Sequence, residues 1–313
     1  MATIQSATGP LDTAELGFTL THEHVVVGSP PIREQFPDLF SRETVLEVAV
    51  ANLRQACDAG VRTIVDLTPI TLGRDAALIR EASQRSGMQI IVATGLYWFT
   101  DLYAAFTPPE QLVALFVRDI EQGILDTGVR AGVIKCATQP DMNPLNEKVL
   151  RASAQAHRRT GVPIGTHTFV ANRTGLDQAR VFREEGVDLG RVIIGHSDDS
   201  DDIDYLEAII EAGAYLGMDR IGIPRPRTSE QRADMIAALI ERGYVDRICL
   251  SHDSGVMEGY DEALKAERSP DWRYTFIPRE FRSLLTERGV TDDQFEQMTT
   301  RNPQTIFEQT EPY

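Results

Sequence analysis

Short apolar runs recur along the chain, separated by longer segments in which apolar residues return every three or four positions. A short apolar run bounded by turn residues predicts a buried strand, and the longer periodicity predicts an amphipathic helix. The runs that predict strands are residues 18–24, 63–67, 89–95, 132–137, 163–168, 192–196, 215–218 and 248–253. The periodic segments that predict helices, many of them followed by glycine, are residues 43–59, 75–85, 109–122, 146–159, 176–185, 202–212 and 229–242.

This alternation of strands and helices predicts a parallel sheet, because each helix returns the chain to the same end of the sheet. Eight such units in a chain of 313 residues favour a closed (β/α)8 barrel, the TIM barrel fold. An open, doubly wound sheet is the alternative, but no Gly-x-Gly-x-x-Gly turn follows the first strand and no Walker-type phosphate loop occurs. No linker or shift in composition divides the chain, so we expect one domain over residues 1–313.

Charge and composition narrow the choice of partners. The chain carries 31 basic and 47 acidic residues, a net charge of -16, which argues against nucleic acid and anionic membranes as partners. Residues 1–10 lack the features of a signal peptide, and no apolar run has the length of a membrane span. We therefore expect a cytoplasmic protein. Its three cysteines, Cys57, Cys136 and Cys249, are expected to be reduced packing residues.

Two histidines stand two residues apart at the end of the first predicted strand. Because side chains alternate across a strand, His22 and His24 point to the same side while Glu23 points away. That spacing suits two ligands on one metal ion. The alternative is a pair of polar residues at the edge of a sheet.

Lys135 lies inside the apolar run 131–137, where an unpaired ammonium group would be costly to bury. Reaction of the neutral amine with carbon dioxide would give an anionic carbamate able to bridge two cations. An ion pair between Lys135 and a buried carboxylate is the alternative.

Three further candidates, His167, His196 and Asp253, lie at or near the ends of three later predicted strands. Each histidine alone could be a core residue with its hydrogen bonds satisfied. In a barrel, however, the C-terminal ends of the strands converge at one mouth, so all six candidates would meet there. Their joint placement predicts a site for two metal ions.

The motifs that carry these residues resemble the phosphotriesterase-like lactonases of the amidohydrolase superfamily, over nearly the whole chain. The motifs are, in order, Thr21-His-Glu-His24, Val133-Ile-Lys-Cys-Ala137, Gly165-Thr-His-Thr168, Ile194-Gly-His196, Gly217-Met-Asp-Arg220 and Ser251-His-Asp253. The opening Gly9-Pro-Leu-Asp12 and the closing Arg301-Asn-Pro303 are also similar to that family.

The resemblance implies a binuclear centre with two divalent metal ions, zinc being expected first and cobalt, iron or manganese as alternatives. His22, His24 and Asp253 would hold the more buried ion. His167 and His196 would hold the more exposed one, with carbamylated Lys135 and a hydroxide between the two ions.

The implied reaction is attack of that hydroxide on a lactone, with N-acyl-homoserine lactones and related γ- and δ-lactones as substrates and phosphotriesters as a side activity. Asp253 would carry the proton to the departing alkoxide, Tyr97 would orient the substrate and Arg220 would organise the loops over the site. The alternatives are a phosphotriesterase or another metal-dependent esterase or amidohydrolase. The family also implies a homodimer.

Three local expectations complete the prediction. The loop 254–277, with its aromatic residues, is expected to form an apolar lid or to pack on the barrel. The acidic run 198–204 is expected to be a solvated helix cap. His157 is expected to be solvated on a polar helix face, and His252 to point away from the mouth.

Overall fold

The computed structural model describes residues 2–39, 41–99 and 102–313, and its centre is one sheet of eight strands. The strands are β3 (Thr19–Glu23), β5 (Thr63–Asp66), β6 (Gln89–Gly95), β7 (Val133–Ala137), β8 (Ile164–His167), β9 (Val192–Ile194), β10 (Tyr215–Met218) and β11 (Ile248–Leu250). All neighbours in the sheet are parallel and follow chain order, from β3 at one edge to β11 at the other. The eight predicted strands are confirmed.

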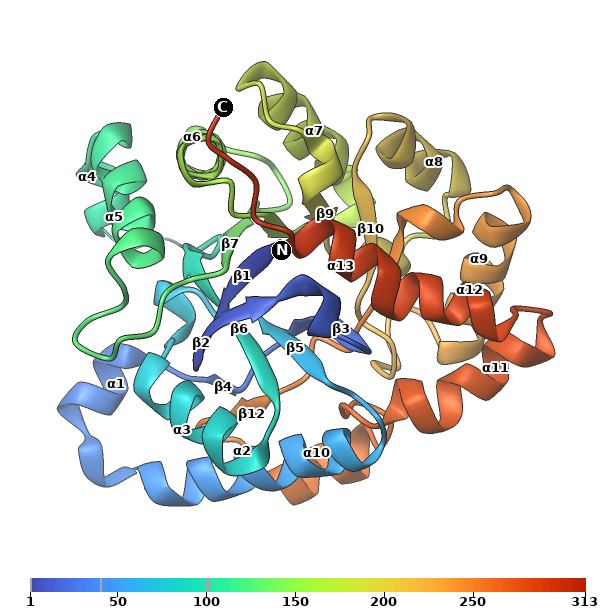
Figure 1. Cartoon of the computed structure of the whole chain (residues 1–313), viewed down its shortest axis with the longest axis horizontal. Helices are drawn as coiled ribbons and strands as arrows, with labels where there is room; N and C mark the ends of the chain where they lie inside the picture. Colours follow the sequence, from blue (N-terminus) through green and yellow to red (C-terminus); the bar gives the residue numbers. More distant parts are fainter. Residues whose placement is uncertain (1, 40, 100–101) are drawn as a thin grey trace.

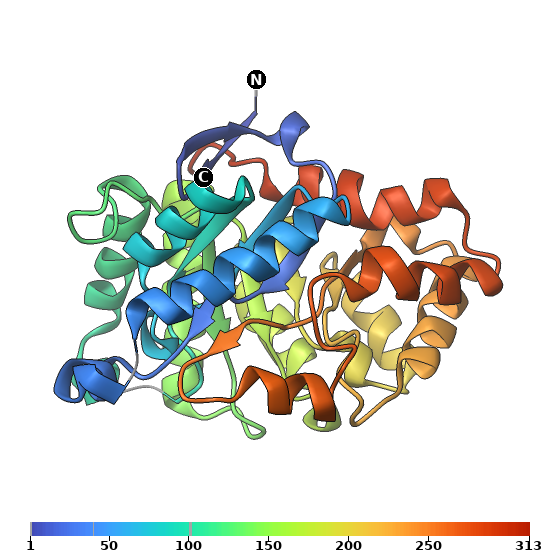
Figure 2. The same cartoon turned by 90° about the horizontal axis from the view of Figure 1, so that it is seen from below.

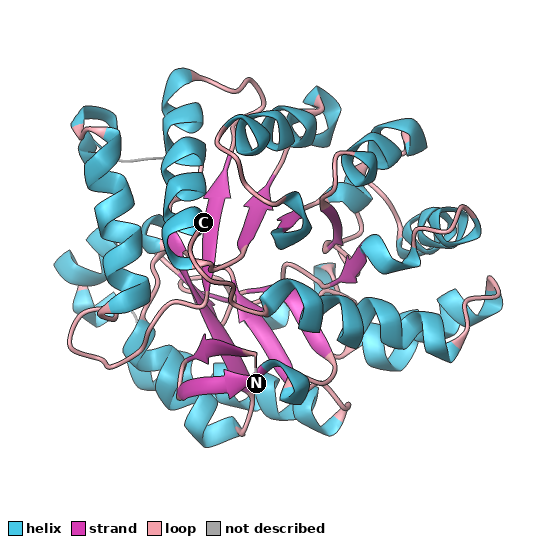
Figure 3. Cartoon of the chain, turned by 45° about the horizontal axis from the view of Figure 1, so that its top comes forward, coloured by secondary structure: helices cyan, strands magenta, loops and turns pink. Residues whose placement is uncertain are grey.

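The two edge strands come together, so that the sheet closes into a barrel (Figure 3). The backbone N–H of His22 donates to Oγ of Ser251 at 2.9 Å, and the N–H of Asp253 donates to the carbonyl of His22 at 3.0 Å. The N–H of His24 donates to the carbonyl of Ser254 at 2.8 Å. The fold is therefore a single α/β barrel, as predicted, and not an open sheet.

Helices surround the barrel on all sides (Figure 1). The main ones are α2 (Arg42–Asp58), α3 (Ala76–Ser86), α5 (Pro109–Glu121), α6 (Pro144–Thr160), α7 (Thr174–Glu184), α8 (Ile203–Glu211) and α9 (Ser229–Glu241). The side chain of Asp75 caps α3 by accepting the N–H of Leu78 at 2.9 Å, and Gly87 ends it with a φ of 81°. The predicted helices agree with these bounds to within two residues.

The N-terminal end of the barrel is closed by the two ends of the chain, which lie on the same side in Figure 2. The hairpin of β1 (Thr3–Ser6) and β2 (Gly9–Asp12) and the helix α13 (Asn302–Phe307) meet there. Ile4 and Phe307 belong to the same buried cluster as Val65 and Ile193 inside the barrel. A packed bottom leaves the opposite end, where the strands finish, as the place for a site.

Shorter elements lie mostly in the connections and near the C-terminus. They are β4 (Val26–Val27), β12 (Val256–Met257), α1 (Pro30–Gln35), α4 (Leu102–Phe106), α10 (Glu262–Arg268), α11 (Arg282–Glu287), α12 (Asp292–Glu296) and the π-helical turns Ile277–Phe281 and Gln297–Arg301. None of the helices in the described ranges is long and apolar enough to cross a membrane.

Two local expectations are corrected by the structure. His157 is fully buried on α6, where Nδ1 contacts the carbonyl of Val162 and Nε2 contacts the hydroxyl of Tyr313. Asp198 is also buried and does not cap a helix, whereas Asp202 caps α8 as expected.

The loop 254–277 does not form an apolar lid over its whole length. It contains β12 and α10, and its residues Tyr274 and Phe276 lie in the main hydrophobic core. The indole N–H of Trp272 donates to the carbonyls of His252 and Asp253, so this side chain packs against the segment that follows β11.

Candidate metal centre

The six predicted ligands gather at the C-terminal mouth of the barrel. His22 lies on β3, Lys135 lies on β7 and His167 ends β8. His24, His196 and Asp253 lie just beyond the ends of β3, β9 and β11.

The backbone turns sharply at two of these residues. His196 has a φ of 61° and Asp253 a φ of 55°, a left-handed conformation that only four non-glycine residues adopt in the described part of the chain. Such a conformation costs on the order of 1 kcal/mol or more, and it persists where the surroundings enforce it. We therefore read both turns as part of the geometry of the site.

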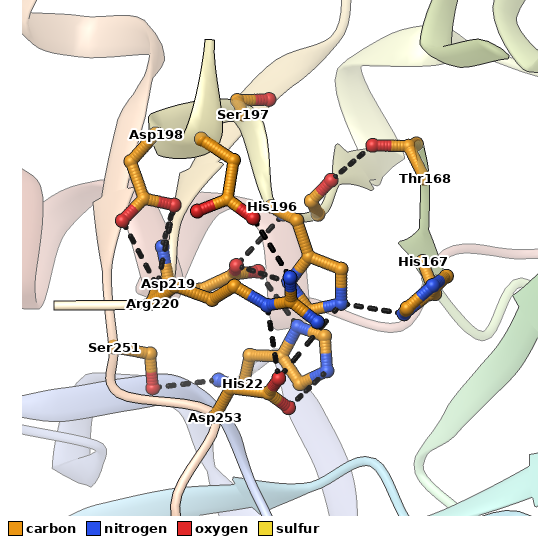
Figure 4. Close-up of polar contacts among 12 residues, drawn as sticks. His22, His167, Thr168, His196, Ser197, Asp198, Asp219, Arg220, Ser251 and Asp253 are labelled. Atoms are coloured by element: carbon orange, nitrogen blue, oxygen red, sulfur yellow. Dashed lines mark hydrogen bonds and ion pairs between the residues drawn. The ribbon is translucent and has the colours of Figure 1, made fainter. Parts of the chain in front are cut away.

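The side chains of His22, His167, His196 and Asp253 point toward one another across the mouth (Figure 4). Nε2 of His22 lies 2.8 Å from Nζ of Lys135 and 3.5 Å from Oδ1 of Asp253. Nε2 of His24 lies 3.1 Å from the same carboxylate oxygen. On the other side of the mouth, Nε2 of His196 lies 2.7 Å from Nδ1 of His167. The structure thus brings all six residues together.

Asp219 orients the imidazoles of His22 and His196 by contacting their Nδ1 atoms, on the side away from the other candidate ligands. Its carboxylate oxygens lie 2.6 Å from Nδ1 of His22 and 2.8 Å from Nδ1 of His196, and the backbone N–H of His196 donates to it at 2.7 Å. Because a carboxylate accepts, each Nδ1 carries the proton and each Nε2 keeps a free lone pair. Burial raises the pKa of Asp219 well above its usual value, and cations held by the two histidines would oppose that rise.

The resulting set of donor atoms fits metal ions. Burial lowers the pKa of His22, His167 and His196 well below the ordinary value, so these imidazoles are neutral. Nε2 of His22, Nε2 of His196 and the Asp253 carboxylate then offer lone pairs to the middle of the mouth, a donor set that suits divalent cations. Donor atoms of His22, His24 and Asp253 all lie within 4.8 Å of one another, as one ion requires.

A second group with the same spacing consists of His22, His196 and Asp219. We do not read it as a separate ion site, because Asp219 contacts both histidines through Nδ1, on the side away from the other donors. Asp219 instead holds the two histidine ligands in place by hydrogen bonds.

Lys135 lies between the two halves of the site and is 1% exposed. Burial lowers the pKa of its amine to about 8, which increases the fraction of neutral amine. Only that neutral form can react with carbon dioxide, so the surroundings favour the predicted carbamate. The neighbouring Cys136 faces the other way, and burial raises the pKa of its thiol to about 12.

A chain of charged groups leads from Asp253 toward the outside of the barrel. Nε of Arg220 donates to Oδ2 of Asp253 at 3.3 Å, and its Nη1 donates to Asp199 at 2.7 Å. Burial alone would raise the pKa of Asp253, but His24, His22 and Arg220 hold it well below the usual range. Asp253 is therefore an ionised carboxylate with a fixed orientation.

Two buried ion pairs of Arg232 hold the charged groups next to Arg220 in place. Arg232 is fully buried and contacts Asp198 and Asp199 at 2.6 Å each. Asp198 also accepts the backbone N–H groups of Asp219 and Arg220, at 3.1 and 3.0 Å. Arg232 thus fixes the segment after β10 that presents Asp219 and Arg220 to the centre.

Tyr97 follows β6 and reaches the site from the side of His167. Its hydroxyl lies 3.2 Å from Nδ1 of His167. Burial, with the negative charge of Asp253, raises the pKa of this phenol to about 12, so it remains protonated. Its ring contacts Phe99, while Trp98 contacts Phe169, which gives this side of the mouth an aromatic wall.

A family model described as the phosphotriesterase family matches residues 2–307. The chain belongs to the phosphotriesterase family. It is 45% identical to the phosphotriesterase homology protein of Mycobacterium tuberculosis (strain CDC 1551 / Oshkosh), over 98% of each chain. It is 35% identical to the aryldialkylphosphatase of Saccharolobus solfataricus, over 95% of this chain and 96% of the relative. The solved structure of the phosphotriesterase from Mycobacterium tuberculosis matches with a TM-score of 0.94 and 44% identity, covering 99% of this chain and all of that one.

Family and geometry agree on the class of protein. It is a metal-dependent hydrolase of the phosphotriesterase family, within the amidohydrolase superfamily, with a His/Asp site of the binuclear type. The resemblance identified from the motifs is confirmed at the level of the family.

Sequence reasoning missed the supporting residues of this phosphotriesterase-family centre. Thr68, which contacts Nδ1 of His24 at 2.8 Å, stands two residues after β5, and Asp219 stands directly after β10. Their positions just past strand ends are the signal that could have found them. Nothing local in the sequence indicates that Arg232, on α9, reaches this site.

Proposed function

We propose that this hydrolase opens lactone rings, with N-acyl-homoserine lactones and related γ- and δ-lactones as substrates and phosphotriesters as a slower side reaction. One observation carries the choice of lactones, namely the protonated hydroxyl of Tyr97 beside His167. A lactone releases an alkoxide, which needs a proton in order to depart, whereas the aryloxide of an aryl phosphotriester departs without one. A hydrogen-bond donor at this position would stabilise the negative charge on the alkoxide oxygen until Asp253 delivers the proton, and it therefore favours lactones.

Two divalent cations, when bound, supply an activated water molecule and polarise the carbonyl group of the substrate. Zinc is the ion we propose first, and the mixed nitrogen and oxygen donors also suit cobalt, iron or manganese. The residues that would hold the cations are His22, His24 and Asp253 for one, His167 and His196 for the other, and carbamylated Lys135 between them.

Asp253 accepts the proton of the attacking water in this proposal and passes it to the leaving oxygen. Its lowered pKa makes the protonated carboxyl a ready donor to an alkoxide. Arg220 keeps the Asp253 carboxylate ionised and aimed at the centre through the Nε contact. Tyr97 donates a hydrogen bond to the substrate on the opposite side of the mouth.

The aromatic wall supports an apolar substituent on the substrate. The rings of Tyr97 and Phe99 have centroids 4.8 Å apart, and those of Trp98 and Phe169 are 6.3 Å apart. Stacked and edge-on aromatic rings bind hydrocarbon by removing it from water. An acyl chain or an alkyl side chain on the lactone would lie along this wall.

The test is a comparison of kcat/KM for lactones of increasing side-chain length, N-acyl-homoserine lactones and paraoxon. Tyr97→Phe is expected to lower kcat/KM for lactones by about 10- to 100-fold and to change paraoxon hydrolysis much less. Tyr103→Phe, at a half-exposed tyrosine outside the centre, is the matched control and should leave both rates unchanged. Equal losses for both substrates in Tyr97→Phe would contradict the proposed role of the phenol.

Phosphotriester hydrolysis is the second candidate function. The relative from Saccharolobus solfataricus that is named an aryldialkylphosphatase, 35% identical to this chain, favours it. A kcat/KM for paraoxon above that of every lactone in the panel would select this function and reject the lactonase proposal.

A further inference from the structure

A cavity separate from the metal centre lies between α2 and the segment that follows β11. Its volume is about 250 Å³, and none of the six predicted metal ligands lines it. Asn52 and Gln55 of α2 form one wall, and Ser254, Lys265 and Trp272 form part of the other. The two helices that flank it, α2 and α10, run along the same edge of the molecule in Figure 1.

Lys265 places a buried cation in the wall of this cavity. The side chain is only 6% exposed, and its Nζ donates to the carbonyl of Gly255 at 2.7 Å and to Oγ of Ser254 at 3.2 Å. The ammonium also lies 4.6 Å from the ring centroid of Trp272. All of these partners are uncharged, and Lys265 forms no ion pair with a carboxylate in the described part of the chain. The carboxylates of Glu262 and Glu23 favour the charged form of Lys265 without pairing with it directly, and an anion in the cavity would offset the remaining cost of burial.

Glu262 places an unsatisfied acceptor in the same cavity. Its Oε1 is buried and has no hydrogen-bond partner among the described residues. The residue lines the cavity and precedes Lys265 by three positions on α10, so both side chains lie on one side of the helix. A buried carboxylate oxygen without a donor is rare, because the hydrogen bonds to water that it loses on burial are not replaced.

We propose that this cavity is a second binding site, for a small carboxylate that also carries a hydrogen-bond donor. The carboxylate of the ligand pairs with Lys265, and its hydroxyl or ammonium group donates to Oε1 of Glu262. One end of such a molecule pairs with the ammonium, which forms no ion pair among the described residues, and the other end donates to the carboxylate oxygen that has no donor there. Burial lowers the pKa of Lys265, and a bound carboxylate would restore it.

The position of the cavity connects it to the metal centre. Ser254 and Gly255, which accept hydrogen bonds from Lys265, directly follow Asp253. The indole of Trp272 donates to the carbonyl of Asp253 at 3.1 Å. An occupant of the cavity would therefore contact the groups that hold the backbone of Asp253. If the proposed function holds, the hydroxycarboxylate released by lactone opening has the chemistry of this ligand. Only this identification of the reaction product as the ligand rests on the proposed function.

The two tryptophans of the chain provide separate reporters for the two sites. Trp272 lines the cavity, whereas Trp98 belongs to the aromatic wall at the mouth. The experiment follows both indole N–H signals by NMR in metal-loaded protein labelled at tryptophan, with assignment from a Trp98→Phe variant. The probes are 4-hydroxybutanoate, 4-aminobutanoate and butanoate.

We expect the Trp272 signal to shift saturably with 4-hydroxybutanoate or 4-aminobutanoate, and the better probe identifies the donor group. Butanoate should bind about tenfold more weakly, because it leaves Glu262 without a donor. Binding of butanoate as tight as that of the other two probes would overturn the assignment of Glu262.

Variants at two lysines complete the test. Lys265→Met should abolish the shift of Trp272, whereas Lys148→Met, at a lysine that contacts Ala105 and Thr107 elsewhere, should preserve it. Lys265→Arg keeps the charge and should retain binding, which leaves the proposal testable if Lys265→Met does not fold. A Trp272 signal that moves with no probe, or a shift of Trp98 alone, would overturn the site. Lactone turnover is measured separately, so its absence would reject the proposed reaction and leave this titration unaffected.

Discussion

The carboxylate of Asp219 lies 2.6 Å from Nδ1 of His22, on the far side of the imidazole from the Asp253 carboxylate. The same side chain contacts His196 at 2.8 Å through its other oxygen. In the proposed assignment these two histidines hold different cations. One buried carboxylate thus sets the tautomer and orientation of a ligand on each side of the centre.

Replacing Asp219 by asparagine should weaken both halves of the centre at once. An amide has one accepting oxygen and one donating nitrogen, so it can accept from only one of the two imidazoles. We expect metal affinity or kcat/KM to fall by about 10- to 100-fold. Metal content after dialysis and steady-state kinetics measure the two effects. Asp204→Asn, at an exposed aspartate, is the matched control and should behave as the unchanged protein.

Reloading of the metal-free protein should depend on carbon dioxide and on pH. The buried Lys135 has a pKa lowered to about 8, so its reactive neutral amine becomes the main form as the pH rises through that value. We expect recovery of activity to be faster above pH 8 than below it, and faster with added bicarbonate. Lys135→Met should lose this response, while Lys148→Met keeps it. Recovery that ignores bicarbonate would argue against the carbamate.

The barrel and its site residues were predictable because the information is local. Alternating apolar runs and helical periodicity require only neighbouring residues, and a residue just past a strand end must lie at the mouth of a barrel. His22 and His24 could be placed together from the period of a strand alone.

The errors arose where a distant segment supplies the contact. His157 looks exposed on its own helix, but the hydroxyl of Tyr313, 156 residues later, covers it. Asp198 looks like a cap, but the guanidinium of Arg232, 34 residues later, makes it a buried ion. Periodicity within one helix carries no information about such partners.

Removing the buried guanidinium of Arg232 should destabilise the protein strongly. Arg232→Met leaves Asp198 and Asp199 buried without their cation, which typically costs about 3–5 kcal/mol. The free energy of unfolding from denaturant titration measures the loss. Arg242→Met, which removes an exposed ion pair with Glu207, should cost less than about 1 kcal/mol. A similar small cost for Arg232→Met would contradict the role we give to this ion pair.

The contact between His157 and the C-terminus should make stability depend on pH. Burial lowers the pKa of His157, so the folded state binds the proton less tightly than the unfolded chain, whose histidines have a pKa of about 6.5. Neutral His157 therefore contributes fully to the free energy of unfolding above about pH 6.5. This contribution is lost as the pH falls toward the lowered pKa of the folded state.

Melting temperatures between pH 8 and pH 5 test this dependence. Buried His22, His167 and His196 contribute in the same direction, so the informative quantity is the difference between the protein and its His157→Gln variant. We expect the melting temperature of the variant to be lower at pH 8 but to fall less on acidification, because it has one fewer group to protonate. Parallel pH curves for the two proteins would show that His157 titrates with the same pKa in the folded and unfolded states.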